Sequence, residues 1–429
     1  MEVVDDHTAI LHLPQVTVSF AQWDQVIPEH LEGPVYAAAK AAGDYINHTI
    51  YNHAPTTPGL WNGPYLISDY KSGDQIVLSR NPHWTGPAPG FKQVVLRTIG
   101  DTAALQANLL SGDIDMDNNL TLDQVLSLRK QYPDRFTYLF TPSLTYGHID
   151  VARDNPVLSD VRVRRALLMA IDRRTIDKRL FDDMQPLATS FVSPRNPDFD
   201  PSIPPVEYDL PGARKLLAEA GWTPGPDGIC RNAAGQRLSA EFLAAAGFRL
   251  NELEMQVMQS AWKQIGVEVT LRTEPSRTLF GQTMKHRSFT GLAMYTWTSN
   301  VGESPRLTLG IDRIPSEANN WGGANFTGFS DPRFNAAITV SETELDPAKR
   351  HAAWVEMQHV YADELPALPT FISAVPAVLP KWLHGFSFSG TGSPSRRTRR
   401  HGAPSEAATV SRARSHPLGN CGRVTARSG

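Results

Sequence analysis

The sequence has little cysteine, no long apolar run and no strong excess of either charge. Two cysteines, Cys230 and Cys421, occur among 429 residues, so at most one disulfide can form, and their spacing matches neither a zinc knuckle nor a disulfide framework. No stretch approaches the roughly 18 uninterrupted apolar residues that a membrane-spanning helix needs. These absences exclude a disulfide scaffold and a membrane-embedded protein.

Motifs that would mark an enzyme or a metal site are also absent. The chain contains no G-x-S-x-G elbow, H-E-x-x-H pair, Walker loop or G-x-G-x-x-G dinucleotide loop. His48 and His53 are five positions apart and His351 and His359 are eight apart, so neither pair has the i, i+4 spacing of a helical zinc site. Asp113–Asp117 lacks the terminal Glu of a calcium loop. The sequence therefore predicts no metal and no cofactor.

The net charge of -3 conceals an uneven distribution. Residues 393–429 hold eight Arg and one Glu, a balance of +7 that leaves the rest of the chain ten charges negative. An acidic body argues against a nucleic-acid partner, because clustered Lys and Arg normally hold the phosphate backbone. The same segment has no aromatic residue and one Leu, so we predict that it is disordered. Binding of nucleic acid or acidic lipid through its arginines stays an alternative.

The N-terminal segment resembles the middle of a domain. The first seven residues are acidic and lack the basic and apolar regions of a secretory signal, so the chain as written shows no export signal. Residues 8–18 mix β-branched and apolar residues with polar ones at alternate positions, which predicts a half-buried strand.

Predicted strands and helices alternate over more than 350 residues. A hairpin is expected from Tyr65–Ile67 and Gln75–Leu78 around a Gly-Asp turn. Further strands are predicted at 94–99, 267–272, 291–297 and 367–378, and helices at 103–110, 160–171, 209–220, 251–265 and after the Asp-Pro pairs at 331–332 and 346–347. This alternation predicts an α/β architecture.

The helices carry capping residues and apolar faces. The expected N-caps are Asp101 or Thr102, Ser159 or Asp160, Asp209, Asp331 and Asp346. The expected inward faces are Val163, Leu167, Ala170 and Ile171 in one helix, and Leu253, Val257, Ala261 and Ile265 in another.

Two tryptophans lie at a predicted strand end and in a segment rich in Gly and Asn, where a ligand pocket can form. Trp297 ends a predicted strand, and Trp321 lies in a segment rich in Gly and Asn that includes Asn325. Each side chain alone could simply pack in the core. Together, flat aromatic walls and backbone that a ligand can approach favour a binding pocket.

Several segments, in this order, resemble the family 5 extracellular solute-binding proteins, the dipeptide and oligopeptide receptors of ABC importers. The similarity covers about residues 5–392. Its pieces are Trp61-Asn62-Gly63-Pro64-Tyr65, Arg80-Asn81-Pro82-His83-Trp84, Leu109–Asp115, Asp160–Leu167, Ala170–Arg173, Lys215–Trp222, Gln264–Val267 and Leu365–Pro369.

The resemblance implies a periplasmic-binding-protein type II-like fold, in which two lobes joined by a hinge close on a ligand. Residues 1–146 with 372–392 would form the first lobe, residues 147–371 the second, and residues 393–429 the Arg-rich tail. The chain would cross between lobes within Phe140–Val151 and Leu368–Val378.

The resemblance also implies a function. The chain would be a monomer that captures a peptide or a similar small polar solute in the periplasm, delivers it to ABC permease subunits in the inner membrane, and catalyses nothing. The expected ligand-binding residues are Tyr146, Trp297, Glu303, Trp321 and Asn325. Where many relatives have an Asp that pairs with the ligand's amine, this chain has Asn300–Pro305, and Glu303 is the expected substitute.

Two departures from the family lead to a different expectation about the chain's integrity. Relatives have well over a hundred residues before the segment that resembles Asp6–Ile10, and their C-terminal ends are rich in aromatic residues. We therefore expect a truncated first lobe and a reading-frame change near residue 395, as in a non-functional remnant. The other alternative is a secreted hydrolase of peptides or glycosides, using carboxylates of Glu342–Glu344 or Asp363–Glu364, although these stretches lie on predicted helices where charge usually faces solvent.

Overall fold

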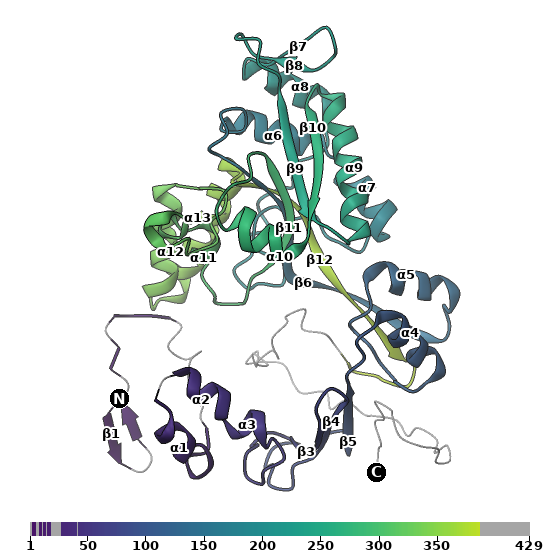
Figure 1. Cartoon of the computed structure of the whole chain (residues 1–429), viewed down its shortest axis with the longest axis vertical. Helices are drawn as coiled ribbons and strands as arrows, with labels where there is room; N and C mark the ends of the chain where they lie inside the picture. The colour runs from purple at the N-terminus through teal and green to yellow at the C-terminus, as the bar shows by residue number, and fades with distance from the viewer. Residues whose placement is uncertain are drawn as a thin grey trace. The chain divides into compact units, whose positions relative to one another are not determined.

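The computed structural model describes residues 2–5, 8–10, 12–13, 15–18, 27–40 and 42–386 (Figure 1). The chain divides into two compact units. The larger unit contains Met1–Trp23 and Pro142–Ala374, and the smaller unit contains Asp24–Thr141 and Val375–Phe388. The chain therefore passes between units inside β6 (Phe136–Val151) and β12 (Ala367–Pro380). The predicted Arg-rich tail at 393–429 lies outside the described residues.

A five-stranded mixed sheet forms the centre of the larger unit. Its order is β10-β9-β11-β6-β12. β9 (Ser239–Ala245) pairs in parallel with β10 (Glu268–Glu274) and with β11 (Leu292–Thr298), whereas β11 and β6 are antiparallel. The predicted strands at 267–272, 291–297 and 367–378 are thus confirmed to within a few residues.

Helices cover both faces of this sheet (Figure 1). α12 (Pro332–Thr343) and α13 (Pro347–Glu364) contribute Phe334 and Met357 to a core that also contains Ile372 of β12. α9 (Arg249–Gln264) packs against β9, where the ring centroids of Trp262 and Phe242 lie 5.1 Å apart. The other main helices of this unit are α6 (Val161–Met169) and α8 (Leu210–Glu219).

The predicted inward face of α9 is only partly right, because Ile265 is buried and Leu253 and Ala261 are half-buried, but Val257 is not. Val257 is 45% exposed, whereas Met255, Met258 and Trp262 are buried. The sequence offers two apolar stripes about one residue apart. The stripe that contains Trp262 is the buried one. Its indole packs on β9 and donates a hydrogen bond from Nε1 to the Leu167 carbonyl of α6, 2.9 Å away.

Aspartate caps confirm the predicted helix starts. In each case a carboxylate accepts a hydrogen bond from a free backbone N–H of the first turn, at 2.8–2.9 Å, which satisfies a donor that has no partner within the helix. The caps are Asp101 for α4 (Thr102–Ser111), Asp160 for α6, Asp209 for α8, Asp331 for α12 and Asp346 for α13.

Two buried arginines, one within α6 and one just after it, explain part of the Arg-rich sequence in this region. Arg164 donates to the carbonyls of Leu158, Ser159, Glu364 and Leu365 at 2.6–2.9 Å. Arg173 donates to the carbonyls of Ala188, Val206 and Pro369 at 2.6–3.1 Å. Burial lowers the pKa of each guanidinium to about 10. Arg164 joins α6 to the end of α13, and Arg173 joins the residues after α6 to β12, so both arginines have structural roles.

The smaller unit has its own sheet and core. β3 (Tyr65–Lys71), β4 (Gln75–Arg80) and β5 (Gln93–Arg97) form an antiparallel sheet in that order, with Gly73 at φ 75° in the predicted turn. Leu109 of α4 and Leu128 of α5 (Leu122–Gln131) pack with Val378 of β12. The unit also contains α1 (Glu29–Ala38), α2 (Ala42–His48) and α3 (Ile50–His53).

The N-terminal strand is shorter than predicted. β1 (Glu2–Asp5) pairs with β2 (Thr8–Ile10), and the described residues between 12 and 18 are not in a strand. Short elements complete the larger unit: α7 (Arg173–Ile176), β7 (Thr223–Pro224), β8 (Cys230–Arg231), α10 (Ser276–Thr278) and α11 (Arg306–Leu309).

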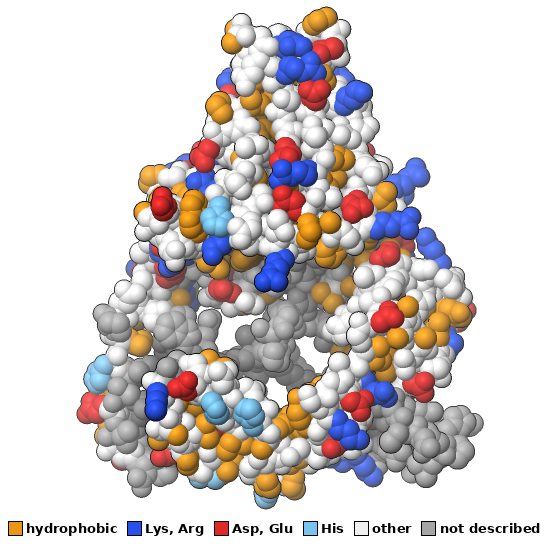
Figure 2. Space-filling view, in the orientation of Figure 1, with side chains coloured by type: hydrophobic (Ala, Val, Ile, Leu, Met, Phe, Trp, Pro, Cys, Tyr) orange, Lys and Arg blue, Asp and Glu red, His pale blue; other side chains and the backbone are white. Residues whose placement is uncertain are grey.

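Charged side chains of both signs are interspersed over the visible face of the larger unit (Figure 2). Ion pairs also join opposite charges at the surface of this unit: Arg237 Nε lies 2.9 Å from Glu268 Oε2, and Arg272 Nη2 lies 2.5 Å from Glu274 Oε1. Such pairs contribute little to stability, but they neutralise charge locally.

Candidate functional site

A row of aromatic and ionisable residues lies along β6 and β11 in the larger unit. Tyr146 faces Trp297, and His148 faces Tyr295, in the antiparallel register of the two strands. Residues directly opposite one another share a face of the sheet. The Tyr146 ring stacks on the His148 ring with centroids 4.5 Å apart, and Tyr295 meets the same imidazole edge-on at 4.4 Å.

A buried carboxylate anchors this row. Asp150 accepts a hydrogen bond from the Tyr295 hydroxyl at 2.5 Å, and its Oδ1 lies 3.3 Å from Nε2 of His148. Burial, together with the charge of Asp150, raises the pKa of Tyr295 well above its ordinary value and also raises that of Tyr146. Both phenols therefore stay protonated, and the row forms a rigid layer.

Trp297 lies at the end of this row, at the border of the core. Its side chain is half-buried and packs against two hydrophobic clusters, one containing Tyr146 and the other containing Tyr295. Its neighbour Tyr146 is only 3% exposed. Of the five predicted ligand-binding residues, the structure brings these two together.

The other three predicted residues make their contacts elsewhere. Glu303 is exposed, and its Oε2 accepts a hydrogen bond from Asn300 Nδ2 at 2.6 Å. Trp321 has φ 56°, and its ring lies 4.8 Å from that of His286. Asn325 is fully buried, and its amide is engaged with Gly310 O (3.0 Å), Phe329 O (2.9 Å) and Phe329 N (3.0 Å). In this structure Asn325 fixes a turn.

A comparison with models of protein families identifies the family of this chain. The model for the middle part of the bacterial extracellular solute-binding proteins of family 5 matches residues 1–310. The chain belongs to family 5 of these proteins. Its relatives are extracellular or periplasmic binding proteins, and its α/β fold is that of the type II periplasmic binding proteins.

Relatives of this family 5 protein differ in what they bind. The nickel-binding periplasmic protein of Escherichia coli is 26% identical over 65% of this chain and 52% of its own length. The oligopeptide-binding protein AppA of Bacillus subtilis is 29% identical over 57% of this chain and 43% of its own length. The chain thus spans about half the length of these curated relatives.

A solved structure has a similar level of identity over more of the chain. The oligopeptide-binding protein of Thermus thermophilus, complexed with a pentapeptide, is 30% identical to this family 5 protein and superimposes with a TM-score of 0.59. The match covers 83% of this chain and 67% of that protein.

Sequence reasoning missed His148, Asp150 and Tyr295 of the polar row. A signal was present, because Tyr146, His148 and Asp150 alternate along one strand and so share a face. Tyr295 precedes Trp297 by the same step of two. The aromatic end of each strand was recognised, but the buried ionisable residues behind it were not.

Neither a metal-binding cluster nor a membrane-spanning helix occurs in the part of the chain that the structure describes. That part contains no group of three or more His, Cys, Asp or Glu side chains placed to hold a metal ion. Among the same residues, every helix is too short or too polar to span a bilayer.

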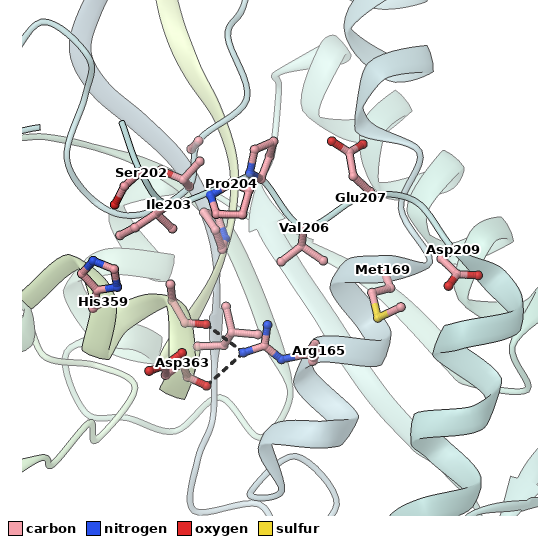
Figure 3. Close-up of a pocket in the computed structure, with 16 residues that line it drawn as sticks. Arg165, Met169, Ser202, Ile203, Pro204, Val206, Glu207, Asp209, His359 and Asp363 are labelled. Carbon is pink, nitrogen blue, oxygen red and sulfur yellow. Dashed lines mark hydrogen bonds between the residues drawn. The ribbon is translucent and has the colours of Figure 1, made fainter. Parts of the chain in front are cut away.

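A large pocket of the larger unit lies away from the polar row. It has a volume of about 470 Å³ and is lined by residues of α6, the segment at 202–209 and α13 (Figure 3). None of the five predicted ligand-binding residues lines it. The pocket and the polar row are therefore separate candidate sites.

Proposed function

We propose that this chain is the substrate-binding component of an ABC importer, which captures a peptide or a similar small polar solute between two lobes. The observation that carries the proposal is membership of family 5, together with a 30% identical relative that was solved with a pentapeptide. The chain acts outside the cytoplasmic membrane as a monomer, delivers its ligand to permease subunits and performs no chemistry on it.

Trp297 and Tyr146 supply the floor of the proposed site. The indole is half-buried and rests on a layer that the Tyr295–Asp150 hydrogen bond holds rigid. A rigid aromatic surface binds a peptide without a large loss of side-chain entropy. Glu303 is exposed and negatively charged, as a partner for the amino group of a peptide must be. Trp321 and Asn325 act at a second segment of the site, the latter by fixing its backbone.

Calorimetric titration of the full-length chain with alanine peptides of two to five residues tests the proposal. We expect binding of at least one peptide, and recovery of the peptide intact by mass spectrometry. Trp297→Ala should weaken binding about tenfold or more, as expected for an aromatic anchor. Phe248→Ala, which removes an exposed aromatic ring of the same unit, is the matched control and should change nothing.

Cleavage of the peptide would contradict the proposal in favour of a hydrolase. Binding of Ni²⁺ but of no peptide would place the chain with its nickel-binding relative. Equal effects of Trp297→Ala and Phe248→Ala would remove Trp297 from the site.

A further inference from the structure

The pocket of about 470 Å³ has the size and lining of a small-molecule site. Ile203 and Leu365 are buried in its floor, and Met169 and Val206 extend the apolar surface. Figure 3 shows Met169 on α6 and Ile203 and Val206 in the segment preceding α8, and Leu365 is the C-cap residue of α13. All of them belong to the larger unit.

Most ionisable groups around the pocket already have partners. Glu207 accepts a hydrogen bond from Arg174 at 2.7 Å. The Asp209 carboxylate caps α8. Nε2 of His359 lies 3.0 Å from Oδ2 of Asp200. These groups are engaged within the protein and leave a ligand little to bind.

Two opposite charges at the pocket are not engaged in this way. Arg165 donates through Nη2 to the carbonyls of Ala362 (2.9 Å) and Asp363 (3.2 Å), which fixes the guanidinium against α13 (Figure 3). In the described part of the chain, its Nε and Nη1 have no hydrogen-bond partner, and the Asp363 carboxylate has neither a hydrogen bond nor an ion pair. A cation and an anion therefore both line the pocket, each with atoms that are free to bind a ligand.

One polar atom in the wall of the pocket has no hydrogen-bond partner within the part of the chain that the structure describes. Thr189 lines the pocket, and its Oγ1 is buried without a hydrogen-bond partner among the described residues. A buried polar atom without a partner costs free energy, about 1–3 kcal/mol. This hydroxyl lies behind the pocket surface, so it is not itself a contact for a ligand.

We propose that this pocket binds a small zwitterion with an apolar side chain, that is, a free apolar amino acid. Its carboxylate pairs with Arg165, its ammonium group pairs with Asp363, and its side chain lies on the floor of Ile203 and Val206. A molecule with one charge would satisfy only one of the two free groups. The site is distinct from the proposed peptide site, because none of that site's five residues lines the pocket.

Calorimetric titration of the full-length chain with L-phenylalanine tests the zwitterion requirement. Phenethylamine lacks the carboxylate and 3-phenylpropanoate lacks the ammonium group, so we expect each to bind at least about tenfold more weakly than L-phenylalanine. Equal affinity for L-phenylalanine and either analogue would overturn the proposal, as would the absence of L-phenylalanine binding at millimolar concentration.

Three substitutions locate the binding. Asp363→Asn should weaken L-phenylalanine binding about tenfold, whereas Glu356→Gln, which removes the same charge from an exposed position of α13, should not. Trp297→Ala should leave L-phenylalanine binding unchanged. Loss of binding in Trp297→Ala, with retention in Asp363→Asn, would assign the amino acid to the peptide site and overturn the proposal.

Discussion

Tyr295 illustrates how single residues hold the polar row in place. Its hydroxyl donates the 2.5 Å hydrogen bond to the buried Asp150 carboxylate. Tyr295→Phe removes this donor and leaves one carboxylate oxygen without its partner, so we expect a loss of about 1.5–3 kcal/mol in the free energy of unfolding. Urea denaturation measures the loss. Tyr208→Phe, at a 46% exposed tyrosine, should have no effect, and equal stabilities of the two variants would show that the hydrogen bond contributes nothing.

Glu254 makes the stability of the protein depend on pH. It is 7% exposed in α9, and burial raises its pKa from 4.5 to about 8. The folded state thus keeps a proton that the unfolded state releases above pH 4.5, so this residue lowers stability progressively as the pH rises from about 4.5 to about 8. Glu254→Gln should leave stability near pH 4.5 unchanged and raise it at pH 8.

Melting temperatures measured between pH 4.5 and pH 8 test this expectation. The melting temperature of Glu254→Gln should fall less across this range than that of the unaltered chain. Glu356→Gln, on an exposed part of α13, should leave the pH dependence as it was. Parallel curves for Glu254→Gln and the unaltered chain would mean that Glu254 is ionised in the folded protein.

The role of a residue could be predicted from the sequence where its partners are close along the chain. It could not be predicted where the partners lie far along the chain. Asp331 and Asp346 precede prolines, and the geometry of the first helical turn alone makes each of them a cap. The burial of Arg164 and Glu254 depends on carbonyls and helices far along the chain. Charged side chains are expected on the surface, so nothing near these residues in the sequence indicates that they are buried.

At the scale of the element, α9 shows why periodicity alone is insufficient. Leu253, Val257 and Ala261 form one apolar stripe, and Met255, Met258 and Trp262 form another. Only the strand beneath the helix decides between them, because the larger second stripe fills the space over Phe242. The helix itself was predicted to within two residues at its start and one at its end, but its orientation was not.

Substitutions on the two stripes of α9 should differ strongly. Trp262→Ala removes a fully buried indole and its hydrogen bond to Leu167, so we expect a loss of about 3–5 kcal/mol in the free energy of unfolding. Val257→Ala lies on the exposed stripe and should cost less than about 1 kcal/mol. Guanidinium denaturation of both variants measures the difference. Similar losses would mean that the helix buries both stripes equally.

The first and last residues of a strand depend on the neighbouring strands and bridges with which it pairs. The hairpin of β3 and β4 was predictable, since a Gly-Asp turn joins two apolar segments that pair with each other. β12 was predicted two residues short of its observed end at Pro380, where Val378 forms a bridge with Asp117. The aromatic ends of β6 and β11 were recognised as a candidate site, but the pairing of Tyr146 with Trp297 required the register.

At the scale of the whole molecule, the two units have separate hydrophobic cores. Ile149 and Leu243 are fully buried in the larger unit, and Leu128 is fully buried in the smaller one. Local stability therefore can be measured in each unit by amide hydrogen exchange. A ligand slows exchange in the parts of a protein whose folded form it binds, so exchange can distinguish a ligand held by both units from a ligand held by one.

The two proposals predict different exchange patterns in the full-length chain. A peptide captured between lobes binds both, so it should slow exchange around Leu128 as well as around Leu243. L-phenylalanine in the pocket contacts the larger unit alone, so it should slow exchange in residues 160–210 and 355–370 and leave the region of Leu128 unchanged. At a fixed peptide concentration, Trp297→Ala should weaken the first pattern and keep the second. A peptide that slowed exchange only in the larger unit would refute capture between lobes while leaving the amino-acid pocket intact, because that pocket lies wholly within this unit.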